Sequence, residues 1–137
     1  MREKSCGAIV YKKENNEYKF LLVYQNNGHY SFPKGHVEIG ENEIETALRE
    51  IKEETNLSVK IDDGFRYSIE YLVEQKNVMK DAVYFVATPI SDKLQAQEGE
   101  INECIWCSYE EAYEKLKFDN IREVLKKAYN YIKGIDK

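Results

Sequence analysis

Three glutamates, Glu50, Glu53 and Glu54, stand close together near the end of a stretch with helical periodicity. At about 100° per residue, their side chains fall within one arc of the helix surface. Carboxylates at this spacing repel each other, and the C-terminal end of a helix adds negative potential of its own. A divalent cation would reverse both penalties, and such oxygen-rich clusters suit Mg²⁺ or Mn²⁺. The ordinary alternative is a solvated acidic face, so the surrounding residues must decide between the two.

The helix that carries these glutamates is expected to begin at Asn42, because Asn42 and Glu45 have the spacing of a capping box. Apolar residues then recur at intervals of three and four and form a stripe beside the acidic arc. They are Ile44, Ala47, Leu48 and Ile51. The stripe predicts that one face of the helix packs on a core and that the glutamates lie at the border of that face.

Residues 35–57, GHVEIGENEIETALREIKEETNL, resemble the signature box of the Nudix hydrolases, which cleave nucleoside diphosphates linked to another moiety. The matching positions are Gly35, Glu41 and the run Arg49–Leu57. Only Asn56 departs, because the family pattern has glycine there. Asparagine is the next-best residue for the left-handed conformation that ends a helix, so the departure changes little.

The resemblance implies a role for each residue of the box. Arg49 would pair with Glu41 and hold the loop against the helix. The metal ligands would be the carbonyl of Gly35 and the carboxylates of Glu50, Glu53 and Glu54. Together they would hold Mg²⁺ or Mn²⁺ against the phosphates of the substrate.

Residues 29–36, HYSFPKGH, look like the HWxxPKGH stretch of the asymmetrical diadenosine tetraphosphate hydrolases, a branch of the same family. Tyr30 stands where that branch usually has tryptophan. Tyr30 would belong to the substrate-binding residues, together with Lys34 and His36, which match the branch and would hold phosphates of the substrate. The loop hydrogen bond that a histidine can make is the alternative for His36.

A second stretch, Lys80–Phe85, is similar to the Lys-x-x-x-Tyr-aromatic strand of that branch. There the tyrosine stacks on an adenine and the lysine approaches phosphate. Tyr84 would offer its ring to the base and Lys80 its charge to the polyphosphate. A core position is the alternative for Tyr84, since tyrosines on strands are usually core or rim residues.

One further carboxylate is expected at the metal site. By register with the family, Glu100 matches an additional glutamate that reaches the metal cluster as a ligand or as the general base, and Glu103 is the alternative. The attacking water would lose its proton to Glu54 or to Glu100.

The elements that position these residues read as an α/β chain. Runs rich in β-branched and aromatic residues predict strands at 5–12, 18–25, 58–61, 65–73, 82–88 and 101–107. Capping residues predict two more helices, one after Ser108 and one capped by Asp119. A central mixed sheet between helices, an α/β/α sandwich, buries all the apolar stripes, and the resemblance to the Nudix fold implies the same layout. We expect a single domain, residues 1–137.

Composition narrows the choice of partners. The chain has 137 residues with a formal net charge of -5, so no stable complex with nucleic acid and no attachment to a membrane surface is expected. The N-terminal residues lack the apolar core of a signal peptide, and we expect a cytoplasmic protein that is a monomer or a weak dimer. Cys104 and Cys107 form a CxxC pair, which we interpret as core or edge thiols because further zinc ligands are missing.

The sequence therefore predicts metal-dependent hydrolysis of nucleoside polyphosphates, most specifically the asymmetrical cleavage of diadenosine tetraphosphate to ATP and AMP. An RNA 5′-pyrophosphohydrolase or a nucleoside triphosphate pyrophosphatase is the alternative. A nucleotide-sensing module without turnover is a second alternative, but binding alone does not need the full set of Glu50, Glu53 and Glu54.

Overall fold

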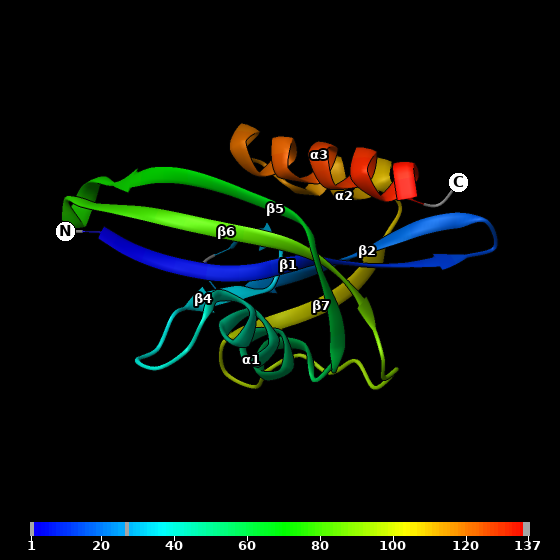
Figure 1. The fold of residues 1–137 in the computed structure, drawn as a ribbon, viewed down its shortest axis with the longest axis horizontal. Coiled ribbons are helices and arrows are strands. Elements are labelled where there is room, and N and C mark those ends of the chain that lie inside the picture. Colours follow the sequence, from blue (N-terminus) through cyan, green and yellow to red (C-terminus); the bar gives the residue numbers. More distant parts are fainter. Residues whose placement is uncertain (1, 27, 136–137) are drawn as a thin grey trace.

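The computed structural model describes residues 2–26 and 28–135 and has three layers. A mixed sheet lies in the middle, helix α1 (Glu43–Thr55) covers one face, and α2 (Tyr109–Lys115) and α3 (Asp119–Ile135) cover the other (Figure 1). This is the α/β/α sandwich that the sequence predicts.

The sheet is built around two long strands that run in parallel, β1 (Arg2–Glu14) and β6 (Val78–Pro89). Its order is β3-β2-β1-β6-β5, with β4 paired to β1 and β7 paired to β2, and every pairing other than β1–β6 is antiparallel. The remaining strands are β2 (Glu17–Gln25), β3 (Tyr30–Ser31), β4 (Lys34–His36), β5 (Val59–Val73) and β7 (Ile101–Cys107). A short 3₁₀ helix, η1 (Glu74–Lys76), joins β5 to β6.

Strands β1 and β6 extend beyond the predicted ranges 5–12 and 82–88, and the short strands β3 and β4 are not among the predicted ones. Two further boundaries also differ. The strands predicted at 58–61 and 65–73 are one strand, β5, in which a register shift between Asp62 and Tyr67 lets the chain continue past the irregularity. Asp119 is the first helical residue of α3 and not its cap. The carbonyl of Phe118 accepts the backbone N–H groups of Ile121 at 3.1 Å and Arg122 at 3.0 Å, so the helix begins one residue earlier than the sequence indicates.

Alternation along the strands produces two cores, one on each face of the sheet. In β6, Tyr84 faces α2 and α3, whereas Val83 and Phe85 face α1. The core under α3 includes Phe20, Leu22, Leu125 and Ile132, and the core under α1 includes Val10, Leu21 and Ile51. The helices therefore bury opposite faces of the same strands, which fixes the position of α1 relative to the sheet.

The same alternation separates the two cysteines of the CxxC pair. Cys104 packs with the core under α1, and Cys107 packs with the core under α3. Positions three apart on a strand point to opposite faces, so the two thiols cannot share a metal ion or a disulfide. Both are free thiols, as the sequence interpretation expects.

Helix α3 is amphipathic, and its buried residues are Val124, Leu125, Ala128 and Ile132. Its outer face is charged and includes an ion pair between Glu123 and Lys127. Among the residues that the structure describes, no helix has both the length and the apolar character needed to cross a membrane.

Candidate active site

Helix α1 has the capped ends that its sequence predicts. The Asn42 side chain accepts the N–H of Glu45 at 2.8 Å, and the Glu45 carboxylate accepts the N–H of Asn42 at 2.9 Å. At the other end, Asn56 adopts the left-handed conformation with a φ of 66°. These caps fix the length of the helix and therefore the turn on which each glutamate lies.

The segment before α1 lies very close to β1. Strand β4 pairs with β1 so that Gly35 is opposite Cys6, and a Cβ atom on Gly7 would overlap the carbonyl oxygen of Pro33. A Cβ atom on Gly35 would likewise overlap the carboxylate of Glu50. Glycine is thus needed at position 7, where the overlap is with backbone, whereas a side chain at position 35 would displace the carboxylate of Glu50.

Arg49 joins this loop to the helix. Its Nε donates to Glu41 Oε2 at 2.6 Å, and its Nη2 donates to Glu41 Oε1 at 3.0 Å and to the carbonyl oxygen of His36 at 2.9 Å. The hydrogen bond from Arg49 lowers the pKa of Glu41 to about 2. The structure therefore has the pairing that the family resemblance implies, and it places Glu41 in the scaffold of the site.

The three glutamates of the predicted metal cluster differ in their surroundings. Glu54 is only 7% exposed, Glu50 is also largely buried, and Glu53 is partly open to solvent. Arg49 Nη1 lies 3.4 Å from Glu50 and 3.3 Å from Glu53, so a fixed cation partly neutralises these two carboxylates. Glu54 forms no salt bridge among the described residues, although the charge of Lys34 is close enough to lower its pKa.

Burial dominates the electrostatics of Glu54. Desolvation and the nearby Glu50 raise the pKa of Glu54 to about 8, although a backbone hydrogen bond from Lys34 opposes the rise. Burial also raises the pKa of Glu50. Within the described residues, Glu54 Oε1 is buried without a hydrogen-bond partner. An oxygen in this position is ready to accept a proton or to bind a cation.

Glu100 lies beside the glutamates of α1. It lines a groove of about 440 Å³ together with Glu50, Glu53 and Glu54, and its charge contributes to the raised pKa of Glu54. Glu103 does not line this groove. Its carboxylate accepts the hydroxyl of Tyr30 at 2.8 Å, so Glu100 is the carboxylate with access to the cluster.

Besides Arg49, three basic side chains line the same groove. Lys80 Nζ lies 3.3 Å from His36 Nε2, and Lys34 lies beside Gly35. Burial and the neighbouring Lys80 lower the pKa of His36, and burial lowers the pKa of Lys34. The groove thus combines the carboxylates of α1 and Glu100 with nitrogen donors from β4 and β6, which suits a polyphosphate together with its cations.

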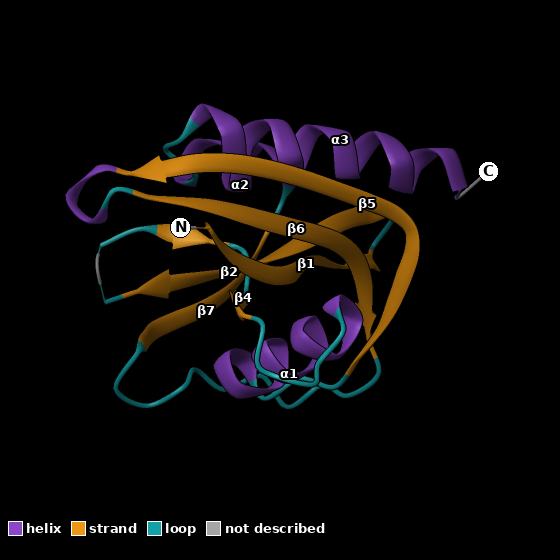
Figure 2. Cartoon of the chain, turned by 60° about the vertical axis from the view of Figure 1, so that its left-hand side comes forward, coloured by secondary structure: helices purple, strands orange, loops and turns teal. Residues whose placement is uncertain are grey.

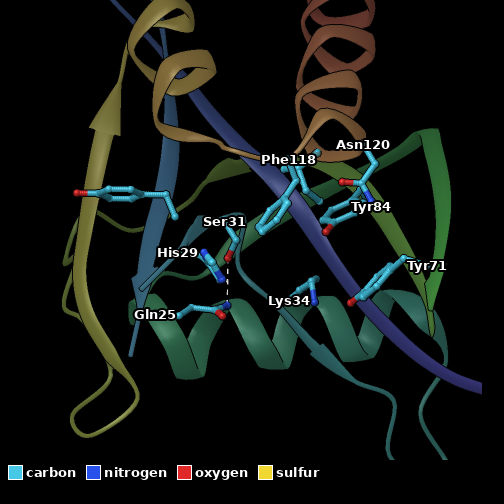
Figure 3. A pocket seen from close by; sticks show the side chains of 10 residues that line it. Gln25, His29, Ser31, Lys34, Tyr71, Tyr84, Phe118 and Asn120 are labelled. Carbon is cyan, nitrogen blue, oxygen red and sulfur yellow. Dashed lines mark hydrogen bonds between the residues drawn. The ribbon is translucent and has the colours of Figure 1, made fainter. Parts of the chain in front are cut away.

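A second cavity, of about 370 Å³, opens next to the groove and is lined largely by aromatic side chains. Figure 3 shows Phe118 and Tyr84 on one side of it, His29 and Ser31 on another, and Lys34 between them and α1. Lys34 lines both the cavity and the groove, so the two depressions are neighbours.

Tyr84 and Tyr30, which the sequence predicts as substrate contacts, interact with other parts of the protein in this structure. Tyr84 is 0% exposed, packs edge-to-face on Phe32 and belongs to the core, which is the alternative that the sequence left open. A ring buried in this way has no free face for a base, so the stacking role is not supported. Tyr30 lines the cavity, but its ring lies under Lys115 and its hydroxyl is bound to Glu103.

Several cavity residues were missed by reasoning from the sequence. Phe118, Asn120 and Ile121 come from the junction of α2 and α3, and Gln25 and Tyr71 come from the ends of β2 and β5. A signal existed only for Phe118, an aromatic residue immediately before a helix in a polar stretch. It is 50% exposed, as a residue open to a ligand must be.

The residues fit a divalent cation by their chemistry. Within residues 2–26 and 28–135, no three His, Cys, Asp or Glu side chains form a ready-made metal site. Uncompensated carboxylates repel each other, and Glu53 is turned toward Arg49. The hard oxygen donors, the unpartnered Oε1 of Glu54 and the contact of Glu50 with Gly35 nevertheless provide what Mg²⁺ or Mn²⁺ needs.

Comparison with known proteins agrees with this reading. The family model for the NUDIX domain matches residues 1–129. The asymmetrical bis(5′-nucleosyl)-tetraphosphatase of Mus musculus is 30% identical over 96% of this chain and 97% of its own length. The solved structure of a C. elegans Ap4A hydrolase binary complex superposes with a TM-score of 0.89 at 28% identity and covers 96% of this chain and 98% of that one.

The role of Arg49 can be tested by stability. Arg49→Ala should lower the free energy of unfolding by about 1–3 kcal/mol, because it removes the hydrogen bonds that Arg49 donates to Glu41 and to the carbonyl of His36. Arg66→Ala is the matched control, since Arg66 also binds one glutamate through two bonds but on an exposed face. It should cost less than about 1 kcal/mol. Equal denaturation midpoints for the two variants would contradict a special role for Arg49.

The raised pKa of Glu54 gives the metal-free protein a defined pH dependence. The pKa of Glu54 is about 8 in the folded protein and 4.5 in the unfolded chain. The contribution of Glu54 to the free energy of unfolding is therefore most favourable below pH 4.5, where the group is neutral in both states, and is lost as the pH rises to about 8. Glu54→Gln should therefore melt like wild type at pH 4.5 but about 3–5 kcal/mol more stably at pH 8.5. Thermal melts in a chelator across this range measure the effect. Parallel curves for the two proteins would show that Glu54 titrates normally.

Proposed function

The chain belongs to the Nudix hydrolase family, since the domain model matches residues 1–129, and from this we propose that it hydrolyses diadenosine tetraphosphate asymmetrically to ATP and AMP. The observation that carries the proposal is the contact between an acidic groove and an aromatic cavity through one shared residue, Lys34. A polyphosphate with a nucleoside at its end has the matching chemistry.

The full-length similarity supports this choice of substrate. The relatives from mouse and C. elegans that carry the name bis(5′-nucleosyl)-tetraphosphatase align with 96% of this chain and with 97% of their own lengths. The alignment therefore includes the regions outside the Nudix box, where Phe118, Tyr71 and Lys80 lie. These regions form the walls that a substrate would contact.

In the proposed complex, the aromatic cavity holds one adenosine. Phe118 is half exposed and has its ring 5.1 Å from the ring of His29, so it offers an accessible aromatic surface for a base. The buried hydroxyl of Tyr84 lies at the cavity wall without a hydrogen-bond partner among the described residues and can bind a polar atom of the nucleoside. Lys34 then leads the phosphate chain toward the acidic groove.

The acidic groove holds the scissile phosphates and their cations. Nudix hydrolases generally need a divalent metal, and we propose Mg²⁺ or Mn²⁺, held by Glu50, Glu53, Glu54, Glu100 and the carbonyl of Gly35. When bound, such a metal offsets phosphate charge and lowers the pKa of water.

The protein's own groups complete the reaction. Lys34, Lys80 and His36 bind and orient the phosphate oxygens in the groove. Glu54, whose Oε1 has no hydrogen-bond partner among the described residues, or Glu100 accepts the proton of the attacking water.

A substrate panel tests the proposal. Purified protein with Mg²⁺ should convert diadenosine tetraphosphate to ATP and AMP faster than it hydrolyses nucleoside triphosphates or 5′-triphosphate RNA. Glu54→Gln should keep the circular dichroism spectrum and lose at least about a hundredfold in kcat, because it removes a charge needed only at the reacting phosphate. Glu110→Gln, an exposed change on α2, is the control and should be fully active. Release of two ADP molecules, or a preference for RNA, would contradict the proposal.

The nucleoside site can be tested separately from the core. Phe118→Ala should raise KM for diadenosine tetraphosphate about tenfold to a hundredfold with little change in Tm, since stacking on a base is worth roughly 1–3 kcal/mol. Tyr113→Ala, which removes another exposed aromatic outside the cavity, is the control. Tyr84→Ala should instead destabilise by about 3–5 kcal/mol, whereas Tyr84→Phe should melt near wild type. An unchanged KM in Phe118→Ala would refute the cavity as the base site.

A further inference from the structure

The segment between β6 and β7, residues 90–100, lies along the C-terminal end of α1 and leads to Glu100 (Figure 2). The N–H of Gln95 donates to the carbonyl of Thr55 at 2.9 Å, and the N–H of Gln97 donates to the carbonyl of Glu54 at 3.1 Å. These bonds satisfy carbonyl groups that the end of a helix leaves without partners. The segment and the helix end thus form one hydrogen-bonded unit.

Asn56 adds a side-chain bond to this unit. Its backbone is left-handed, with a φ of 66°, and its N–H donates to the carbonyl of Lys52 at 2.9 Å, as a helix cap requires. Its side chain does something further, because Nδ2 donates to the carbonyl of Lys93 at 2.9 Å. Glycine would adopt the same backbone conformation but has no amide for this second bond.

The end of the segment is held at β2. The N–H of Asn26 donates to the carbonyl of Glu100 at 3.2 Å, the Asn26 side chain donates to the carbonyl of Gly99, and the N–H of Ile101 donates to the carbonyl of Gln97 at 3.0 Å. Glu100 therefore lies in a short segment that is hydrogen-bonded to the end of α1 on one side and to Asn26 on the other. The first attachment is on the same helix as Glu54, next to its C-terminus.

We propose that Asn56 is a positioning residue, whose side-chain bond to the segment 90–100 sets the place of Glu100 relative to Glu54. The inference rests on the proposed function, because it takes Glu100 to be part of the metal site. This role of the Asn56 side chain is separate from helix capping, which needs only the left-handed backbone conformation.

The variant Asn56→Gly separates the two tasks, since it keeps the left-handed backbone and removes the side-chain bond. Asn16→Gly is the matched control. Asn16 also has a left-handed backbone, with a φ of 63°, but lies in the turn between β1 and β2. Both replacements change the chain entropy in the same way, so a difference between them reports on the bond to Lys93.

The first measurement uses metal-free protein and does not depend on turnover. Amide hydrogen exchange at Gln95 and Gln97 should become several times faster in Asn56→Gly, with Tm close to wild type, because the segment opens more often once the side-chain bond is lost. Asn16→Gly should leave both amides unchanged. Wild-type exchange at both amides in Asn56→Gly would overturn the proposal.

The second measurement is a double-mutant cycle with Glu100→Gln. Asn56→Gly alone should lower kcat/KM about two- to tenfold, the value of one neutral hydrogen bond, and should weaken Mn²⁺ binding measured by calorimetry. In the Glu100→Gln background, it should cause no further loss. An equal loss in both backgrounds would show that Asn56 does not act through Glu100.

The cycle also distinguishes failure of this inference from failure of the proposed function. If Glu100→Gln lowers turnover but Asn56→Gly is fully active, the positioning role is wrong and the site assignment stands. If Glu100→Gln is itself fully active, Glu100 has no part in turnover, and the positioning role is overturned with that assignment.

Discussion

The hydrogen bonds of Arg49 are the interaction on which the site depends. One guanidinium binds Glu41 through two atoms, reaches the carbonyl of His36, and lies within 3.4 Å of both Glu50 and Glu53. It therefore joins the loop to the helix and at the same time reduces the repulsion among the carboxylates. Glu54 forms no ion pair with Arg49 among the described residues, and its burial, together with the nearby Glu50, raises its pKa to about 8.

The path of the chain through Pro33 places two chemically different depressions next to each other. The aromatic cavity borders the face of the sheet covered by α2 and α3, whereas the acidic groove borders the face covered by α1. Residues 33–35 run between them, and Lys34 lines both. A ligand with an aromatic end and a highly charged chain can therefore occupy both depressions, because the fold separates the apolar and ionic parts of recognition by a single segment.

Features with local causes could be predicted from the sequence. The capping box of Asn42, the left-handed Asn56, the order of the strands along the chain and the pairing of Arg49 with Glu41 all follow from residue types at short spacing or from the family box. Features that depend on packing could not. The burial of Tyr84 is set by α3, which is distant in sequence, and the contribution of Phe118 depends on how two helices meet. The bulge after Asp62 likewise reflects pairing with β6.

The close passage of the loop over β1 has a consequence for the tolerance of the sequence to change. Gly7 is distant in sequence from residues 35–57 and has no side chain that could take part in chemistry, yet any side chain there would collide with Pro33 and Lys34. In a survey of all single substitutions, position 7 would behave like a catalytic position and reject every residue but glycine. At Gly7, sensitivity to mutation would reflect the short distance between two backbone segments. It would not show that Gly7 takes part in catalysis.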